Sequence, residues 1–75
     1  MNVYCLLNAM DEELQDKSSV DLRLYNIPNM KMGFISVKNL LADAPDEILN
    51  AAITDFDIEF NTEYGYFMFT IFIKM

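Results

Sequence analysis

Residues 54–74 read TDFDIEFNTEYGYFMFTIFIK, and this stretch decides the fold. From Asp55 to Phe60, acidic and apolar residues alternate strictly, which is the pattern of a β-strand with two different faces. Residues 66–74 are rich in β-branched and aromatic side chains, which favour strands. The intervening residues, Asn61 to Gly65, suit a hairpin connection. The sequence therefore predicts a C-terminal β-hairpin over about 54–74.

One face of the first predicted strand carries a row of carboxylates. On a strand, side chains at every second position share a face at a spacing of roughly 6.5–7 Å. The members of this acidic row are Asp55, Asp57 and Glu59, and Glu63 is placed to extend it. Two interpretations stay open. The row is either a negative ladder that imitates a nucleic-acid backbone and docks in a basic groove, or a solvated strand face that discourages edge pairing.

The alternate residues of the same strand form an apolar row, Phe56, Ile58 and Phe60. Because this row faces away from the carboxylates, we expect it to lie in the core.

The second strand of the hairpin is apolar on both faces. One face carries Phe67, Phe69, Ile71 and Ile73, and the other carries Tyr66, Met68, Thr70 and Phe72. A strand of this kind has to be covered on both sides. It is therefore either central in a closed core or part of an interface, in which we expect Tyr64 and Tyr66 to be hydrophobic contacts.

The charges are unevenly distributed along the 75 residues. Twelve acidic and five basic residues give a net charge of −7, of which −1 falls on residues 1–38 and −6 on residues 39–75. Beyond the acidic row and Glu63, the second half holds a second acidic patch, Asp43, Asp46 and Glu47. A one-sided negative field steers a basic protein partner toward the chain. The same field opposes direct binding to DNA, RNA or an anionic membrane.

Residues 45–53 are predicted as a helix, because Pro45 suits the first helical position and Asp46 and Glu47 suit the first turn. Its apolar stripe would pack on the sheet through Ile48, Leu49, Ala52 and Ile53. Residues 38–44 are predicted as one or two helical turns.

Residues 20–26 are predicted as a half-buried strand with Asp21 and Arg23 on its polar face. A turn signal at Pro28-Asn29 precedes a predicted return strand that runs through about residue 37. Met30, Met32 and Phe34 alternate along this strand, and Gly33 weakens it or marks a bulge.

The N-terminal segment allows two interpretations. The favoured one is a strand at 2–7 followed by a short helix at 9–17, with Asn8 as its cap and the acids in its first turn. The other is one helix over 3–16, because Val3, Leu6, Leu7, Met10 and Leu14 fall at helical spacing. With the hairpin, these elements define a single α+β domain with an antiparallel sheet of four or five strands and one or two short helices.

The composition argues against catalysis and cofactor binding. There is no His and one Cys, so His-based triads and intrachain disulfides are excluded. Cys5 lies in an apolar run, and we expect it to be a buried hydrophobe. Asp55-x-Asp57-x-Glu59 resembles the start of an EF-hand loop, but Phe60 stands where that loop needs Gly. We expect no metal, no cofactor and no enzymatic activity. The N-terminus lacks a secretory signal and the apolar runs are too short for a membrane helix, so we expect a cytoplasmic protein.

These features favour a small acidic inhibitor that occupies the basic nucleic-acid-binding site of another protein by charge mimicry. Phages and mobile elements encode proteins of this physical type, including inhibitors of CRISPR, restriction and repair enzymes. One alternative is a homo-oligomeric structural or adaptor protein that assembles, for instance as a homodimer, through the C-terminal strand. Another alternative is an antitoxin that neutralises a basic toxin such as a nuclease.

Overall fold

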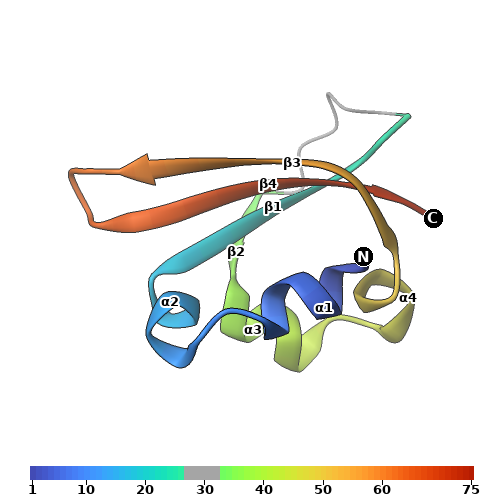
Figure 1. The fold of residues 1–75 in the computed structure, drawn as a ribbon, viewed down its shortest axis with the longest axis horizontal. Coiled ribbons are helices and arrows are strands. Elements are labelled where there is room, and N and C mark those ends of the chain that lie inside the picture. The colour runs from blue at the N-terminus through green and yellow to red at the C-terminus, as the bar shows by residue number, and fades with distance from the viewer. Residues whose placement is uncertain (27–32) are drawn as a thin grey trace.

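The computed structural model describes residues 1–26 and 33–75, and these form one four-stranded sheet and four short helices (Figure 1). The strands are β1 (Ser18–Leu24), β2 (Phe34–Ser36), β3 (Ala52–Asn61) and β4 (Tyr66–Lys74), in the order β2-β1-β4-β3. Two pairings are antiparallel, and the central one, between β1 and β4, is parallel. The predicted α+β class, a sheet of four strands and the C-terminal hairpin are confirmed. The sheet is mixed and not wholly antiparallel as predicted, and the described residues form four short helices where one or two were expected.

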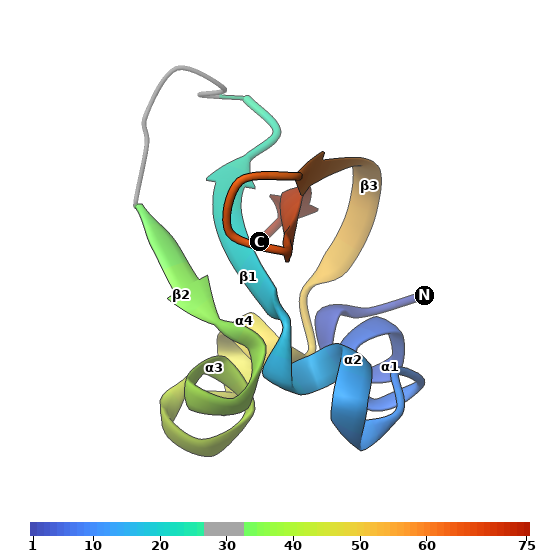
Figure 2. The same ribbon diagram turned by 90° about the vertical axis from the view of Figure 1, so that its left-hand side faces the viewer.

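All of the described helices lie on one face of the sheet (Figures 1 and 2). They are α1 (Val3–Asn8), α2 (Glu12–Asp16), α3 (Val37–Asp43) and α4 (Asp46–Leu49). Between these helices and the sheet lies the core, whose main members are Val3, Leu7, Val20, Leu22, Val37, Leu40, Phe69, Ile71 and Ile73. One apolar face of β4 is therefore buried, as expected of a central strand. Its other face, which carries Met68 and Phe72, is partly exposed.

The segment predicted as a strand over 2–7 is a helix, so that prediction is wrong. The side chain of Asn2 accepts the backbone N–H of Cys5 at 2.7 Å and caps α1. Val3 and Leu7, one turn apart on the same side of the helix, are fully buried. Cys5 lies on another side of α1 and is exposed, which contradicts its expected burial.

The single helix over 3–16 is also wrong, because the chain breaks between α1 and α2. The predicted helix at 9–17 is the shorter α2, and its cap is Asp11, not Asn8. The Asp11 carboxylate accepts the N–H of Leu14 at 2.8 Å. The side-chain amide of Gln15 donates to the carbonyl oxygens of Leu7 and Met10, at 3.2 and 3.1 Å, and so links α2 to the end of α1.

The helix predicted over 45–53 is shorter than expected. It ends at Leu49, and Ala52 and Ile53 already belong to β3. The cause is a pairing with the N-terminus, since Val3 donates its N–H to the carbonyl of Ala51 (3.2 Å) and Ile53 donates to that of Met1 (3.1 Å). These bonds hold residues 51–53 extended. Ile48, Leu49 and Ile53 do pack against the core, whereas Ala52 is exposed.

The helical turns predicted over 38–44 are present as α3, which Ser36 caps through the N–H of Asn39. An ion pair joins α3 to α2, with Lys38 Nζ 2.6 Å from Asp16 Oδ1 and 3.6 Å from Glu12 Oε1. The hydrogen bond to Asp16 raises the pKa of Lys38 above its ordinary value of 10.5.

The strand predicted over 20–26 is β1, shifted toward the N-terminus, and the described part of the predicted return strand is β2. Asp21 is buried on β1, where its Oδ2 accepts from Nε of Arg23 at 3.0 Å. Pro28, Asn29, Met30 and Met32 lie outside the described residues.

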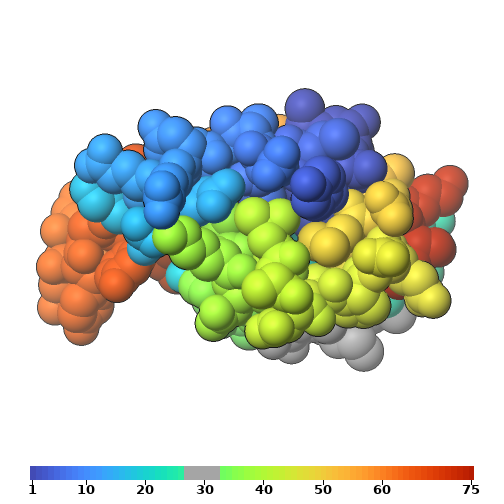
Figure 3. All heavy atoms as spheres, turned by 90° about the horizontal axis from the view of Figure 1, so that it is seen from below, coloured from blue at the N-terminus to red at the C-terminus, as the bar shows by residue number. Residues whose placement is uncertain are grey.

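The apolar row of β3 is exposed, which contradicts its predicted place in the core. Phe56, Ile58 and Phe60 are 42%, 56% and 49% exposed. They point to the same face as the helices, because they lie opposite Ile71, Phe69 and Phe67 of β4. The helical layer, however, ends before the tip of the hairpin, which projects beyond it (Figures 1 and 3). β3 is also the outermost strand, so burial on that side is missing as well.

Candidate functional site

The acidic row lies on the sheet face opposite the helices. Asp55, Asp57 and Glu59 stand opposite Phe72, Thr70 and Met68 of β4, which alternate with the buried residues of that strand. All three acids are exposed, and Asn61 continues the row opposite Tyr66. The structure therefore brings together a line of carboxylates and a parallel line of partly apolar side chains on one rigid support.

The cations of the described residues interact with other partners, although Arg23 and Lys74 lie on the same face of the sheet as the row, near its Asp55 end. Lys17 pairs with Glu13, Lys38 with Asp16 and Glu12, and Arg23 with Asp21. The ammonium group of Lys74 lies over the ring of Tyr25, 5.7 Å from its centroid. Among the described residues, no ion pair reaches Asp55, Asp57 or Glu59. Their negative charge is directed into solvent and is available to a partner.

The hairpin tip extends the row with the other residues predicted for this site. Asn61 Oδ1 accepts the backbone N–H groups of Glu63 (3.0 Å) and Tyr64 (3.2 Å) and so orders the turn. Tyr64 is 69% exposed, and Tyr66 is exposed beside Asn61 at the start of β4. Glu63, Tyr64 and Tyr66 thus lie at one end of the acidic row.

The second acidic patch is not part of this site. Asp43 ends α3, and Asp46 and Glu47 begin α4, so all three belong to the helical layer on the opposite side of the sheet. Asp46 and Glu47 occupy the first turn of α4, where negative charge stabilises a helix. Their placement gives them a structural explanation that the acidic row lacks.

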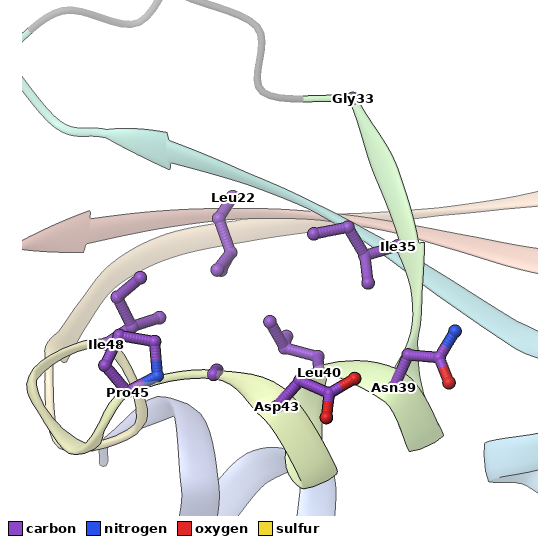
Figure 4. Close-up of a pocket in the computed structure, with 9 residues that line it drawn as sticks. Leu22, Gly33, Ile35, Asn39, Leu40, Asp43, Pro45 and Ile48 are labelled. Atoms are coloured by element: carbon purple, nitrogen blue, oxygen red, sulfur yellow. The ribbon is translucent and has the colours of Figure 1, made fainter.

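Asp43 instead borders a cleft of about 390 Å³ between the helices and the sheet. Leu22, Ile35, Leu40 and Ile48 converge in this cleft from four different elements (Figure 4). Its lining is apolar apart from Asp43 and Asn39.

Sequence reasoning missed the apolar row as a surface feature. The ring of Phe60 contacts that of Phe67, with centroids 4.8 Å apart, so the patch continues onto β4. The alternation of acidic and apolar residues gave the direction of the apolar row but not its exposure, which depends on how far the helical layer extends over β3. The sequence did not indicate that this strand would lie at the edge.

The described residues show neither a metal centre nor a membrane-spanning helix. Among them, no group of three or more Asp, Glu or Cys side chains has the arrangement to hold a metal ion. Nor does any described helix combine the length and apolar character needed to span a membrane. Comparison with protein-family models, curated protein sequences and solved structures gives no match for the chain.

Proposed function

We propose that the protein is a non-enzymatic inhibitor that binds a basic protein through the acidic row and occupies that protein's nucleic-acid-binding site. The observation that carries the proposal is the row itself: three exposed carboxylates in line on a paired strand, with no counter-cation among the described residues. Regularly spaced negative charges on a rigid support imitate the phosphates of a nucleic-acid strand in charge and linear arrangement.

The neighbouring side chains suit the same role. Tyr64 and Tyr66 stand exposed at the end of the row, and tyrosine is enriched in the centres of protein interfaces. The class of target is a nuclease, a restriction or CRISPR enzyme, or a repair protein, because these carry basic grooves for nucleic acid. A toxin nuclease would fit equally, and the protein would then be an antitoxin. We place this activity in the cytoplasm, where the exposed thiol of Cys5 would stay reduced.

The first prediction concerns the charge of the row. The variant Asp55→Asn/Asp57→Asn/Glu59→Gln keeps the shape of the side chains and removes three charges. Its matched control is Asp43→Asn/Asp46→Asn/Glu47→Gln, which makes the same chemical changes in the helical layer. Wild type and control, immobilised and exposed to bacterial lysate, should retain a nucleic-acid-binding protein that the row variant loses. Mass spectrometry identifies the retained protein.

Salt and competing nucleic acid provide the decisive controls. Raising NaCl from about 50 to about 500 mM should weaken the complex by at least roughly tenfold, because screening acts on exposed charges. Added double-stranded DNA or RNA should displace the protein from its target. Retention of the target by the row variant, or a complex unchanged in strong salt, would refute charge mimicry.

A second candidate function, self-assembly, has one observation in its favour, the exposed apolar row. Both edges of β4 are already paired, so a homo-oligomer would use the exposed apolar row of β3 or the partly exposed face of β4 that carries Met68 and Phe72. Light scattering of the wild type over a range of concentrations separates the two functions, since only self-assembly makes the apparent mass rise.

A further inference from the structure

The outer edge of β3 lies beside the acidic row. The sheet ends at β3, so within the described residues one side of this strand has no partner strand. Its first residues are occupied by the hydrogen bonds of Ala51 and Ile53 to the N-terminus. The stretch from Asp55 to Asn61 remains open, and it includes both the acidic row and the apolar row.

The direction of the backbone groups along this stretch follows from the pairing. Phe67 donates its N–H to the carbonyl of Lys17 (2.7 Å) and the carbonyl of Ile73 accepts from Tyr25 (2.9 Å), so alternate residues of β4 bond to β1. Residues opposite one another in an antiparallel ladder share both hydrogen bonds or neither. The residues opposite this β1-bonded set are the apolar row, and their N–H and C=O groups therefore point to the open edge.

The backbone N–H of Phe56 points to the open edge, as this pairing requires, but unlike those of Ile58 and Phe60 it already has an acceptor among the described residues. This N–H, which does not bond to β4, is accepted by Asp55 Oδ1 at 2.8 Å. Ile58 and Phe60 have no such local acceptor among the described residues. A long edge strand with outward backbone groups and an exposed apolar face is a template for the addition of another strand.

We infer that this edge binds an extended segment of the partner protein, which adds to the sheet as an antiparallel strand of alternating basic and apolar residues. Residues directly opposite one another share a face of the sheet. Lys or Arg would therefore stand opposite the acidic row, and apolar side chains would cover the apolar row. The inference rests on the proposed function and specifies the partner's chemistry and its mode of binding.

Charge complementarity selects this occupant over a second copy of the chain. Two β3 strands paired antiparallel about a two-fold axis keep like faces on the same side, so carboxylates of one copy would face carboxylates of the other. Like charges directly opposite one another destabilise a strand pair. The same carboxylates attract a basic strand, which also removes the apolar row from water.

The test uses the full chain, labelled with ¹⁵N, and a synthetic heptapeptide in which Lys alternates with Val. In the antiparallel arrangement, Val lies opposite the apolar row and directs its N–H toward β3. One control peptide carries N-methyl groups on its Val residues, which blocks these hydrogen bonds. The other carries the same number of N-methyl groups on Lys, whose N–H groups point away from β3.

Amide hydrogen exchange reports whether the edge is used. Saturating peptide should slow exchange at Ile58 and Phe60 by roughly tenfold, while Asp57 and Glu59, already bonded to β4, change little. The peptide methylated on Val should bind roughly tenfold more weakly than the peptide methylated on Lys, because it loses its hydrogen bonds to the edge. The row variant Asp55→Asn/Asp57→Asn/Glu59→Gln should bind the unmodified peptide more weakly than wild type.

Three outcomes would overturn the inference. Binding without protection of Ile58 and Phe60, and with equal affinity for the two methylated peptides, would mean that the carboxylates bind while the edge does not. Absence of binding by the alternating peptide would also refute the edge, and the lysate experiment would then decide the proposed function alone. If Ile58 and Phe60 are protected from exchange without peptide, and this protection grows with protein concentration, then the edge of β3 binds a second copy of the chain instead.

Discussion

At the scale of single residues, the contact on which stability depends most clearly is the ion pair between Asp21 and Arg23. The side chain of Asp21 is 2% exposed, and its Oδ1 has no hydrogen-bond partner among the described residues. Oδ2 accepts from Arg23, whose side chain is 23% exposed. The carboxylate depends on the guanidinium, whereas the guanidinium can reach water.

We therefore predict that Arg23→Leu lowers the free energy of unfolding by about 3 kcal/mol, because it leaves a buried carboxylate without its cation. Asp21→Leu should cost less, since the Arg23 side chain is partly exposed and its charge is in reach of water. The double variant Asp21→Leu/Arg23→Leu should recover most of the loss, because it leaves neither charge buried. Urea unfolding measures all three. Equal losses from the two single variants would show that Asp21 does not depend on its cation in this way.

Single-residue burial was also the least predictable feature of the sequence. The alternation correctly predicted that the side chain of Asp21 points to the opposite face of β1 from Val20 and Leu22. It also predicted that this side chain would be exposed to solvent, whereas in the structure Asp21 is buried and paired with Arg23. Cys5 lies between apolar residues in the sequence, which predicted burial, yet its side chain is exposed. Periodicity gives the direction of a side chain, whereas burial depends on what packs over that face.

At the scale of elements, the turn between β3 and β4 holds the site in place. Gly65 adopts a positive φ of 70° and donates its N–H to the carbonyl of Asn61 at 2.8 Å. A Cβ at this position would meet nothing within 4 Å, so a substitution is opposed by backbone conformation alone. Gly65→Ala should lower the free energy of unfolding by about 1 kcal/mol.

The matched variant for this prediction is Gly65→Asn, because Asn tolerates the left-handed region better than Ala. It should lose less stability than Gly65→Ala in urea unfolding. A larger loss for Asn would point to crowding at the tip instead of backbone conformation.

Elements with agreeing local signals were predictable, and those with conflicting signals were not. Alternation, β-propensity and turn residues all favoured the hairpin, and the structure contains it. The run Val3-Tyr4-Cys5-Leu6-Leu7 favours a strand by composition, yet Asn2 caps it as a helix and tertiary packing buries Val3 and Leu7. Sheet order was beyond local signals, because β4 pairs with β1, far away in the sequence. The edge position of β3, and with it the exposure of the apolar row, follows from that order.

At the scale of the whole molecule, charge is divided between two surfaces with different physical settings. The helical layer holds acids that have local compensation, since Asp16 and Glu12 pair with Lys38, and Asp46 and Glu47 begin a helix. The acidic row has no such compensation among the described residues. Its charges repel one another and add to the self-repulsion of a chain with net charge −7.

Because only the acids of the helical layer are compensated, neutralising the acidic row and neutralising Asp43, Asp46 and Glu47 should affect stability differently. Either triple variant removes three of the seven excess negative charges, so the net charge goes from −7 to −4. Neutralising the acidic row should raise the free energy of unfolding at low salt by at most about 1 kcal/mol, the Coulomb energy of neighbouring charges at this spacing in water. Neutralising Asp43, Asp46 and Glu47 should give no gain or a loss, because two of these charges stabilise α4.

Urea unfolding of both variants and the wild type, at about 10 mM and about 1 M NaCl, tests this prediction without any partner. The gain from neutralising the row should vanish in strong salt, where the repulsion is already screened. A row that costs stability has no structural explanation on the folded chain, and recognition of a basic partner would account for it. If neutralising the row instead destabilises the protein in both salts, the carboxylates have a role in folding, and their uncompensated charge no longer supports the proposed function.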